Sequence, residues 1–171
     1  MRAAETVSLT GATRADARLL ENLLELYIHD LSEAFSVEPG PDGRFGYDKL
    51  PLYWSEPDRR HAFLIKYGSR VAGFALVTRG SPATPNPDDL DVAEFFVLRA
   101  YRRLGVGRQA AYALWDSIPG HWVVRVADAN RAGQRFWADV VGTYASAAIG
   151  ENAPRHEEGW RIFRFASRNL C

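Results

Sequence analysis

The sequence predicts a single domain of the mixed α+β class, in which helices cover a sheet whose strands pair mostly as antiparallel neighbours. At 171 residues the chain can bury a core of its own, and no repeat, low-complexity tract or linker divides it. Segments with strand and helix periodicity follow one another in the order β-α-β-β-β-α-β-α-β-β. A clear hairpin lies near the middle of that order.

The N-terminal third predicts a helix followed by an irregular segment. Thr13 and Asp16 have the spacing of a capping box, and leucines then recur at helical spacing over about residues 14–35. A break near His29–Asp30 could divide this helix. Residues 37–60 contain four prolines and three glycines and are long for a plain connector, which indicates a functional segment.

The hairpin is predicted from residues 62–80, AFLIKYGSRVAGFALVTRG. Two apolar runs flank Gly68 and Ser69, and a glycine-first pair suits the type II′ turn. The next elements expected are a loop at 80–90, a strand at 91–98, a helix from the glycine turn to about 117 and a strand at 121–126. Asn130 is then expected to cap a short helix with Ala132 and Phe136 on its inner side, and two last strands are expected at 143–149 and 159–166.

Composition limits the classes of partner and location. Basic and acidic residues number 21 each, so the chain has no net attraction to nucleic acid or to a membrane. Cys171 is the only cysteine, which excludes an intrachain disulfide and suits a reducing compartment. No signal peptide or apolar span is visible, so a cytoplasmic location is expected. The histidines show no metal-ligand spacing, and no metal is predicted.

Residues 102–108, RRLGVGR, predict an anion site where a strand meets a helix. Amides at a helix start have no intrahelical partner, the helix dipole adds positive potential, and glycines let the backbone approach a ligand. Between Phe95 and Trp115 there are four arginines and no carboxylate, so positive charge gathers here in a neutral chain. A glycine pair can also simply end a strand.

Two ligands compete for this turn. Gly105, Gly107 and Ala110 satisfy the dinucleotide pattern G-x-G-x-x-A, and Asp128 lies about 20 residues further on. That fold needs repeated parallel β-α-β units, whereas only about 60 residues remain here and an antiparallel hairpin precedes the turn. The topology therefore disfavours a dinucleotide, and the second candidate, coenzyme A, comes from a resemblance to a known family.

Two motifs resemble those of the GNAT superfamily, the acyl-CoA-dependent N-acyltransferases. VLRAYRRLGVGRQAA contains the pattern [Q/R]-x-x-G-x-[G/A] as Arg102, Gly105 and Gly107. NRAGQRFWADVVG resembles N-x-x-A-x-x-F-Y-x-x-x-G through Asn130 and Phe136. The departures are Arg99 in place of a proline, Gly133 in place of the alanine, Trp137 in place of the tyrosine, and Gly142 one position late.

The resemblance implies one GNAT-like domain over residues 1–171, with a mostly antiparallel, splayed sheet of six or seven strands and about four helices. It implies transfer of an acetyl group from acetyl-CoA to an amine of a small molecule or peptide, and a possible homodimer. The alternative is a CoA-binding module without turnover. The cofactor residues implied are Phe95, Phe96 and Val97 for the pantetheine arm, Arg102, Arg103, Leu104, Gly105, Val106, Gly107 and Arg108 for the pyrophosphate, and Asn130 and Phe136 nearby.

The catalytic candidates are two carboxylates and a tyrosine. Asp91 falls where several family members place the base, and Glu94 lies in an apolar run where a charge needs a task or an ion-pair partner. Alternation puts them on opposite faces of the strand unless a bulge intervenes. Because Trp137 has no hydroxyl, Tyr144 or Tyr112 would supply the proton to the leaving thiolate, unless it departs unassisted.

The acceptor is expected between the first helices and residues 37–60. Aromatic and acidic side chains there would suit a small cationic amine, although aromatics in such a segment also serve to pin it to the core. The candidates are Tyr27, His29, Asp30, Tyr47, Tyr53 and Trp54.

Overall fold

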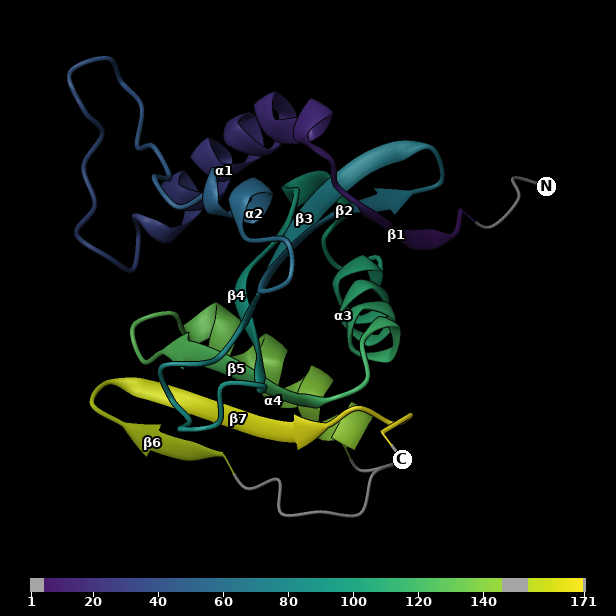
Figure 1. Cartoon of the computed structure of the whole chain (residues 1–171). Coiled ribbons are helices and arrows are strands. Elements are labelled where there is room, and N and C mark those ends of the chain that lie inside the picture. Colours follow the sequence, from purple (N-terminus) through teal and green to yellow (C-terminus); the bar gives the residue numbers. More distant parts are fainter. Residues whose placement is uncertain (1–4, 146–153, 171) are drawn as a thin grey trace.

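The computed structural model of the chain describes residues 5–145 and 154–170. Its strands form one sheet in the order β1-β2-β3-β4-β5-β7-β6, which confirms the mixed α+β class (Figure 1). The elements are β1 (Val7–Gly11), η1 (Arg14–Asp16), α1 (Ala17–Leu31), α2 (Leu52–Ser55), β2 (Arg60–Tyr67), β3 (Arg70–Arg79), β4 (Leu90–Val97), η2 (Arg99–Tyr101), α3 (Val106–Ser117), β5 (His121–Ala127), α4 (Arg131–Ala145), β6 (Arg155–Glu157) and β7 (Trp160–Ala166).

The sheet is antiparallel everywhere except between β4 and β5. Those two strands pair only at Leu90–Trp122 and Asp91–Val123 and then separate, as their directions in Figure 1 show. The sheet is therefore splayed at its centre, as the resemblance implied. The antiparallel order excludes the doubly wound parallel sheet of a dinucleotide-binding fold.

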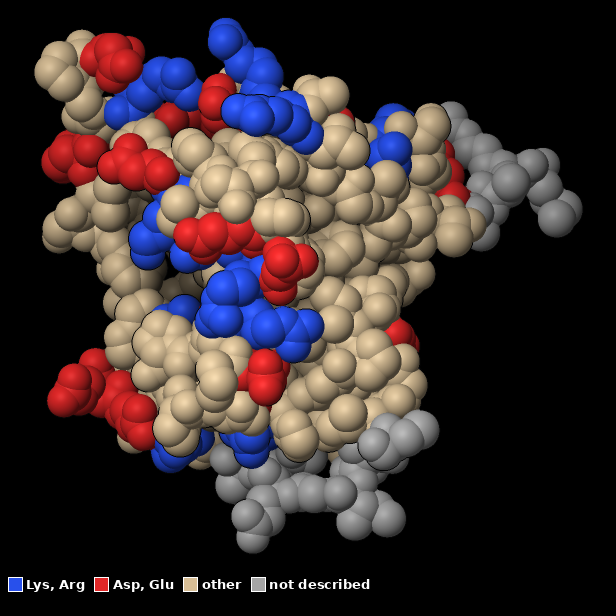
Figure 2. All heavy atoms as spheres, in the orientation of Figure 1, with Lys and Arg blue, Asp and Glu red and all other residues tan. Residues whose placement is uncertain are grey.

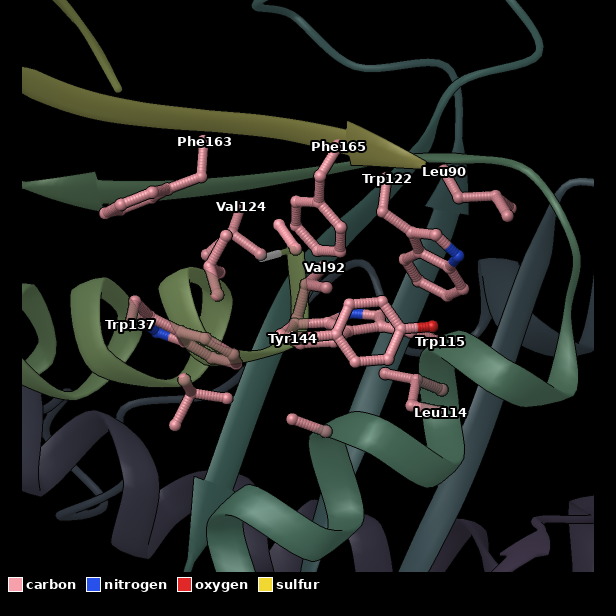
Figure 3. Close-up of a cluster of buried hydrophobic side chains, with 14 of the residues drawn as sticks. Leu90, Val92, Leu114, Trp115, Trp122, Val124, Trp137, Tyr144, Phe163 and Phe165 are labelled. Carbon is pink, nitrogen blue, oxygen red and sulfur yellow. The ribbon is translucent and has the colours of Figure 1, made fainter. Parts of the chain in front are cut away.

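Apolar side chains form a core on each face of the sheet. The leucines of α1 and the residues around α2 pack on Phe74, Leu76 and Phe96. The larger core lies between the sheet and α3 and α4 (Figure 3). Its buried aromatic residues are Trp115, Trp122, Trp137, Tyr144, Phe163 and Phe165.

The predicted hairpin is confirmed, and the first helix is shorter than predicted. β2 and β3 meet at Gly68, whose φ of 61° is the left-handed conformation that a glycine-first turn needs. Thr13 donates its amide to Asp16 Oδ2 over 2.8 Å, which completes the capping box. The helical chain ends at Leu31, close to the break expected at His29–Asp30.

The strand predicted at 143–149 is wrong where the structure describes it. Thr143, Tyr144 and Ala145 form the last turn of α4, and residues 146–149 lie outside the described part of the chain. Val140, Val141, Tyr144 and Ala145 are buried at helical spacing, so the helix continues past its expected end. The strand at the outer edge beside β7 is β6 instead, so the predicted alternation of strands and longer helices is retained. The short helix α2, within the segment predicted to be irregular, is an addition to that order.

Candidate active site

The glycine turn has the backbone of an anion site. Arg103 and Gly105 have φ angles of 63° and 78°, so the chain turns sharply before α3 begins at Val106. Among the described residues, the amides of 103–108 have no hydrogen-bond partner. The turn therefore presents consecutive unpaired N–H groups at a helix N-terminus, where an anion is stabilised.

The arginines around this turn are partly neutralised by distant carboxylates. Arg99 and Arg102 both pair with Asp30 of α1, with 2.7 Å between Arg99 Nη2 and Asp30 Oδ1. Burial would raise the pKa of Asp30, but the hydrogen bonds from both guanidiniums outweigh it and hold that pKa below its usual value. Arg108 pairs with a carboxylate of α4, and Arg103 forms no ion pair with a described residue.

An open strand edge lies beside the turn. Phe95, Phe96 and Val97 follow the last residue of β4 that pairs with β5, while their other edge pairs with β3. The Phe95 ring stacks on Phe136 of α4 with centroids 6.2 Å apart. An extended, amide-bearing ligand could add to the free edge of β4 as a strand does.

Close packing holds α3 and α4 around this edge. Asn130 accepts a hydrogen bond of 2.9 Å from the Gly133 amide and so caps α4. A Cβ at Gly133 would lie 2.6 Å from Asn130 Nδ2, which explains the glycine at a position where the family motif has alanine. A Cβ at Gly107 would lie 3.1 Å from the ring of Phe136.

Glu94 is held by two tyrosines on the α1 side of β4. The hydroxyl groups of Tyr27 and Tyr47 donate to its two carboxylate oxygens over 2.7 and 2.9 Å. Burial raises the pKa of Glu94, although both hydroxyls act in the opposite direction. Burial and the charge of Glu94 also raise the pKa of each tyrosine, so both remain proton donors. The site therefore contains a positioned carboxylate with increased affinity for a proton.

A β-bulge brings Asp91 to the same side of the strand. Asp91 pairs with Thr78 and Glu94 with Leu76, so β4 has one extra residue, Ala93, between them. Asp91 is fully buried, and both its oxygens bind Arg125 of β5, at 2.8 Å to Nε and 3.0 Å to Nη2. The two carboxylates thus share a face but differ in their surroundings.

Glu94 opens into a pocket of about 330 Å³ between the α2 segment and the ends of β3 and β5. Of the predicted acceptor residues, Tyr47 and Tyr53 line it, and Tyr27 reaches it through Glu94. The lining is Tyr47, Lys49, Leu52, Tyr53, Glu56, Arg59, Arg60, Thr78, Arg79, Gly80, Pro82, Ala93, Glu94 and Arg125.

The other three predicted acceptor residues lie outside the lining. The ring of His29 faces Phe45 with centroids 6.4 Å apart, Asp30 binds the arginines, and Trp54 packs on the α1 core. Sequence reasoning missed the basic residues of the pocket, because they come from three segments that only the fold brings together. The adjacent pair Arg59 and Arg60, next to the irregular segment, was the one local signal for them.

The structure does not bring Tyr144 to Glu94. Its hydroxyl donates to Asp116 over 2.7 Å and accepts from the Arg168 amide, within the core on the opposite face of the sheet. The Tyr112 hydroxyl is buried and has no hydrogen-bond partner among the described residues. Trp137 is also buried, with its ring 5.0 Å from Phe95.

Residues 20–142 match the family model described as the acetyltransferase (GNAT) family. The chain belongs to this family. The GNAT resemblance of the two motifs is therefore confirmed. No curated protein matches the sequence.

Within residues 5–145 and 154–170, no helix has the length and apolar character needed to cross a membrane, and no cluster of three or more metal-binding side chains occurs.

Solved structures share the GNAT fold at low sequence identity. An acetyltransferase from Thermus thermophilus superimposes with a TM-score of 0.63 at 16% identity, over 95% of this chain and 98% of that one. The yncA protein of Salmonella typhimurium, solved with acetyl-CoA, gives 0.60 at 13% over 95% of both chains. Spermidine N-acetyltransferase of Vibrio cholerae, solved with CoA and spermine, gives 0.59 at 12% over 92% of both.

Proposed function

We propose that this protein is an N-acetyltransferase that moves the acetyl group of acetyl-CoA to an amine of a small molecule or peptide. Family membership supports acetyl transfer. The cosubstrate is acetyl-CoA, in keeping with the fold neighbours solved with CoA or acetyl-CoA. The residues present fit that ligand, because an unpaired amide turn lies next to an open strand edge.

The chain's own groups divide into two binding regions. The amides of 103–108 would hold the pyrophosphate, and the free edge at Phe95–Val97 would pair with the amides of the pantetheine arm. Bound acetyl-CoA supplies an acetyl group activated as a thioester. Phe95, Phe136 and Trp137 surround the inner end of this edge with apolar surface, which excludes water.

The observation that carries the proposal is the position of Glu94, which opens into the pocket from the strand that also forms the cofactor edge. An amine must lose its proton before it attacks, and a carboxylate with a raised pKa accepts that proton directly or through water. Tyr27 and Tyr47 fix the orientation of the carboxylate. Asp91 forms an ion pair with Arg125, so we assign Asp91 the role of holding Arg125 in position.

No proton donor for the thiolate is needed in this proposal. A CoA thiol has a pKa near the roughly 8.5 of cysteine, so the thiolate leaves at little cost. This is consistent with the apolar Trp137 at the motif position of the tyrosine, and with the separation of Tyr144 from Glu94.

Release of CoA thiol, measured with acetyl-CoA and a panel of amines, tests the function. Glu94→Gln should reduce kcat by about 10²–10⁴-fold, the usual contribution of a general base, and leave the Kd for acetyl-CoA unchanged in isothermal titration. Glu38→Gln, at an exposed position, is the matched control and should leave both values unchanged.

Three outcomes would contradict the proposal. Lack of acetyl-CoA binding at millimolar concentration would reject the function altogether. Full activity of Glu94→Gln would assign the base to another group. Binding of acetyl-CoA without thiol release from any amine would favour a CoA-binding module, the alternative that the replacement of the motif tyrosine by Trp137 supports.

A further inference from the structure

The pocket that contains Glu94 is basic, although the chain as a whole is neutral. Its lining includes five lysines and arginines and only two carboxylates. In Figure 2, lysine and arginine side chains lie beside a hollow on this face of the molecule, with acidic side chains next to them. The basic residues are Lys49, Arg59, Arg60, Arg79 and Arg125, and the acidic ones are Glu56 and Glu94.

Two of these cations are neutralised by carboxylates of the protein. Arg60 Nε lies 2.7 Å from Glu56 Oε2. Arg125 binds the buried Asp91 through two nitrogens. Their charges balance charges already present, so they add little net potential to the pocket.

The other three cations, Lys49, Arg59 and Arg79, form no ion pair with a carboxylate among the described residues. The arginines are instead held by backbone oxygens: Arg59 Nη2 donates to the Arg79 carbonyl over 3.0 Å, and Arg79 Nη1 donates to the Asp88 carbonyl. Like charges that line one pocket repel one another, and a bound anion would relieve this repulsion. The arginine guanidinium also matches a carboxylate or phosphate in shape.

The basic group lies at a distance from Glu94 that a small molecule can span. Leu76, the β3 partner of Glu94, and Arg79 are three residues apart on the strand, so the backbones at Glu94 and Arg79 lie about 10 Å apart along it. The pocket volume of about 330 Å³ is at the lower end for small-molecule sites. A ligand can therefore place one end at Glu94 and the other at the basic group.

We propose, on the basis of the function proposed above, that the acceptor carries an oxyanion group as well as its amine. The amine lies at Glu94, and the carboxylate or phosphate lies against Lys49, Arg59 and Arg79. A diamine or polyamine is disfavoured, because its second cation would face these three charges. The structure thus differs from the cationic acceptor that the aromatic and acidic residues of the sequence indicated.

A series of acceptors matched in length tests this inference. The probes are 4-aminobutyrate, 4-aminobutyramide and 1,4-diaminobutane, with 3-aminopropylphosphonate to separate carboxylate from phosphate chemistry. We expect kcat/KM for the better of the two anionic amines to exceed that of the amide and the diamine at least tenfold. Lys49→Gln and Arg59→Gln should each raise the KM of the anionic acceptor about tenfold, the loss of one charge-assisted contact, with the KM of the amide unchanged.

Arg18→Gln removes an exposed arginine of α1 outside the pocket and is the matched control, for which no change is expected. A diamine acetylated as well as the anionic amines would overturn the inference, and so would Lys49→Gln and Arg59→Gln variants that affect all acceptors equally. Titration of the same four compounds into the CoA-bound protein separates the two proposals. If no compound of this series and no amine of the panel is acetylated, the proposed function fails, yet preferential binding of the anionic compounds would still support this inference. Equal binding of the four would reject it.

Discussion

Glu94 and Asp91 show how surroundings assign different roles to two carboxylates three positions apart. The oxygens of Asp91 bind an arginine and lie fully inside the protein, so this group serves the structure. The oxygens of Glu94 accept only neutral hydroxyl groups and face a pocket, so this group remains available for proton transfer. The sequence placed both on one strand, but it did not contain the identity of their partners.

The raised pKa of Glu94 predicts the acid limb of the pH profile. We expect kcat/KM to rise with pH as Glu94 loses its proton, with a midpoint above the roughly 4.3 of an exposed glutamate. Tyr27→Phe and Tyr47→Phe each remove a hydrogen bond that stabilises the carboxylate, so each should move the midpoint to higher pH. A pH–rate profile with saturating acetyl-CoA measures this shift. Midpoints that move to lower pH would contradict the assignment.

The same pKa predicts a pH dependence of stability. Because the pKa of Glu94 is higher in the folded state than in the unfolded chain, its proton stabilises the folded state at low pH. That contribution is lost as pH rises through the folded-state pKa. Urea unfolding should therefore show Glu94→Gln gaining stability relative to the wild type as pH increases through this range. A constant difference across pH would contradict the raised pKa.

Asp91→Ala should reduce the free energy of unfolding, and not only kcat. The substitution leaves Arg125 without its partner in a partly buried site, and breaking such a pair costs about 3 kcal/mol or more in the free energy of unfolding. Glu5→Ala breaks the exposed pair with Arg70 and should cost less than about 1 kcal/mol. Urea denaturation measures both. An Asp91→Ala protein of normal stability and strongly reduced kcat would instead make Asp91 the base.

At the scale of elements, the start of α4 combines a helix cap with a steric restriction. Asn130 caps the helix through the Gly133 amide, and its side chain occupies the space that a Cβ at position 133 would need. The family motif has alanine there, so the glycine is tied to the cap geometry in this chain. Asn130 was predicted as an N-cap from the sequence, whereas the reason for Gly133 became visible only in the packed helix.

A double-mutant cycle tests this coupling. Asn130→Ala should cost about 1 kcal/mol through loss of the cap. Gly133→Ala should be nearly neutral in the wild type, because its gain in helix propensity is offset by displacement of the Asn130 side chain. In the Asn130→Ala background it should stabilise the protein by about 1 kcal/mol. Thermal or urea unfolding of the four proteins measures the coupling, and strict additivity would contradict it.

At the scale of the whole molecule, the splay between β4 and β5 creates the open strand edge at which we propose that the cofactor binds. Only two residue pairs join these strands, and both lie at the end remote from the glycine turn. The helices on the two faces then supply different parts of the site. α1 carries Tyr27, which donates a hydrogen bond to Glu94, while α3 begins at the glycine turn.

Amide hydrogen exchange should show whether CoA binds at the open edge of β4 and at the glycine turn. On addition of CoA, we expect slower exchange at residues 93–97 and 103–108, because their free amides gain partners. β2, paired on both sides by β1 and β3, should show no change and is the internal control. Mass-spectrometric exchange with and without CoA measures both. Slower exchange at β2 alone would place the ligand elsewhere.

The sequence by itself determined most of the strands and helices and the glycine turn with its unpaired amides, because these depend on local periodicity, on glycine conformation and on amides left unpaired at a helix start. It failed at residues 143–145, where burial on the side of α4 extends a helix beyond its local signals. Only the tertiary structure decided the identity of the proposed base and the charge of the pocket. Both depend on residues far apart in the chain: the bulge at Ala93 turns Glu94 to Tyr27 and Tyr47. The fold also collects Lys49, Arg59 and Arg79 around one cavity, and no local pattern encodes that encounter.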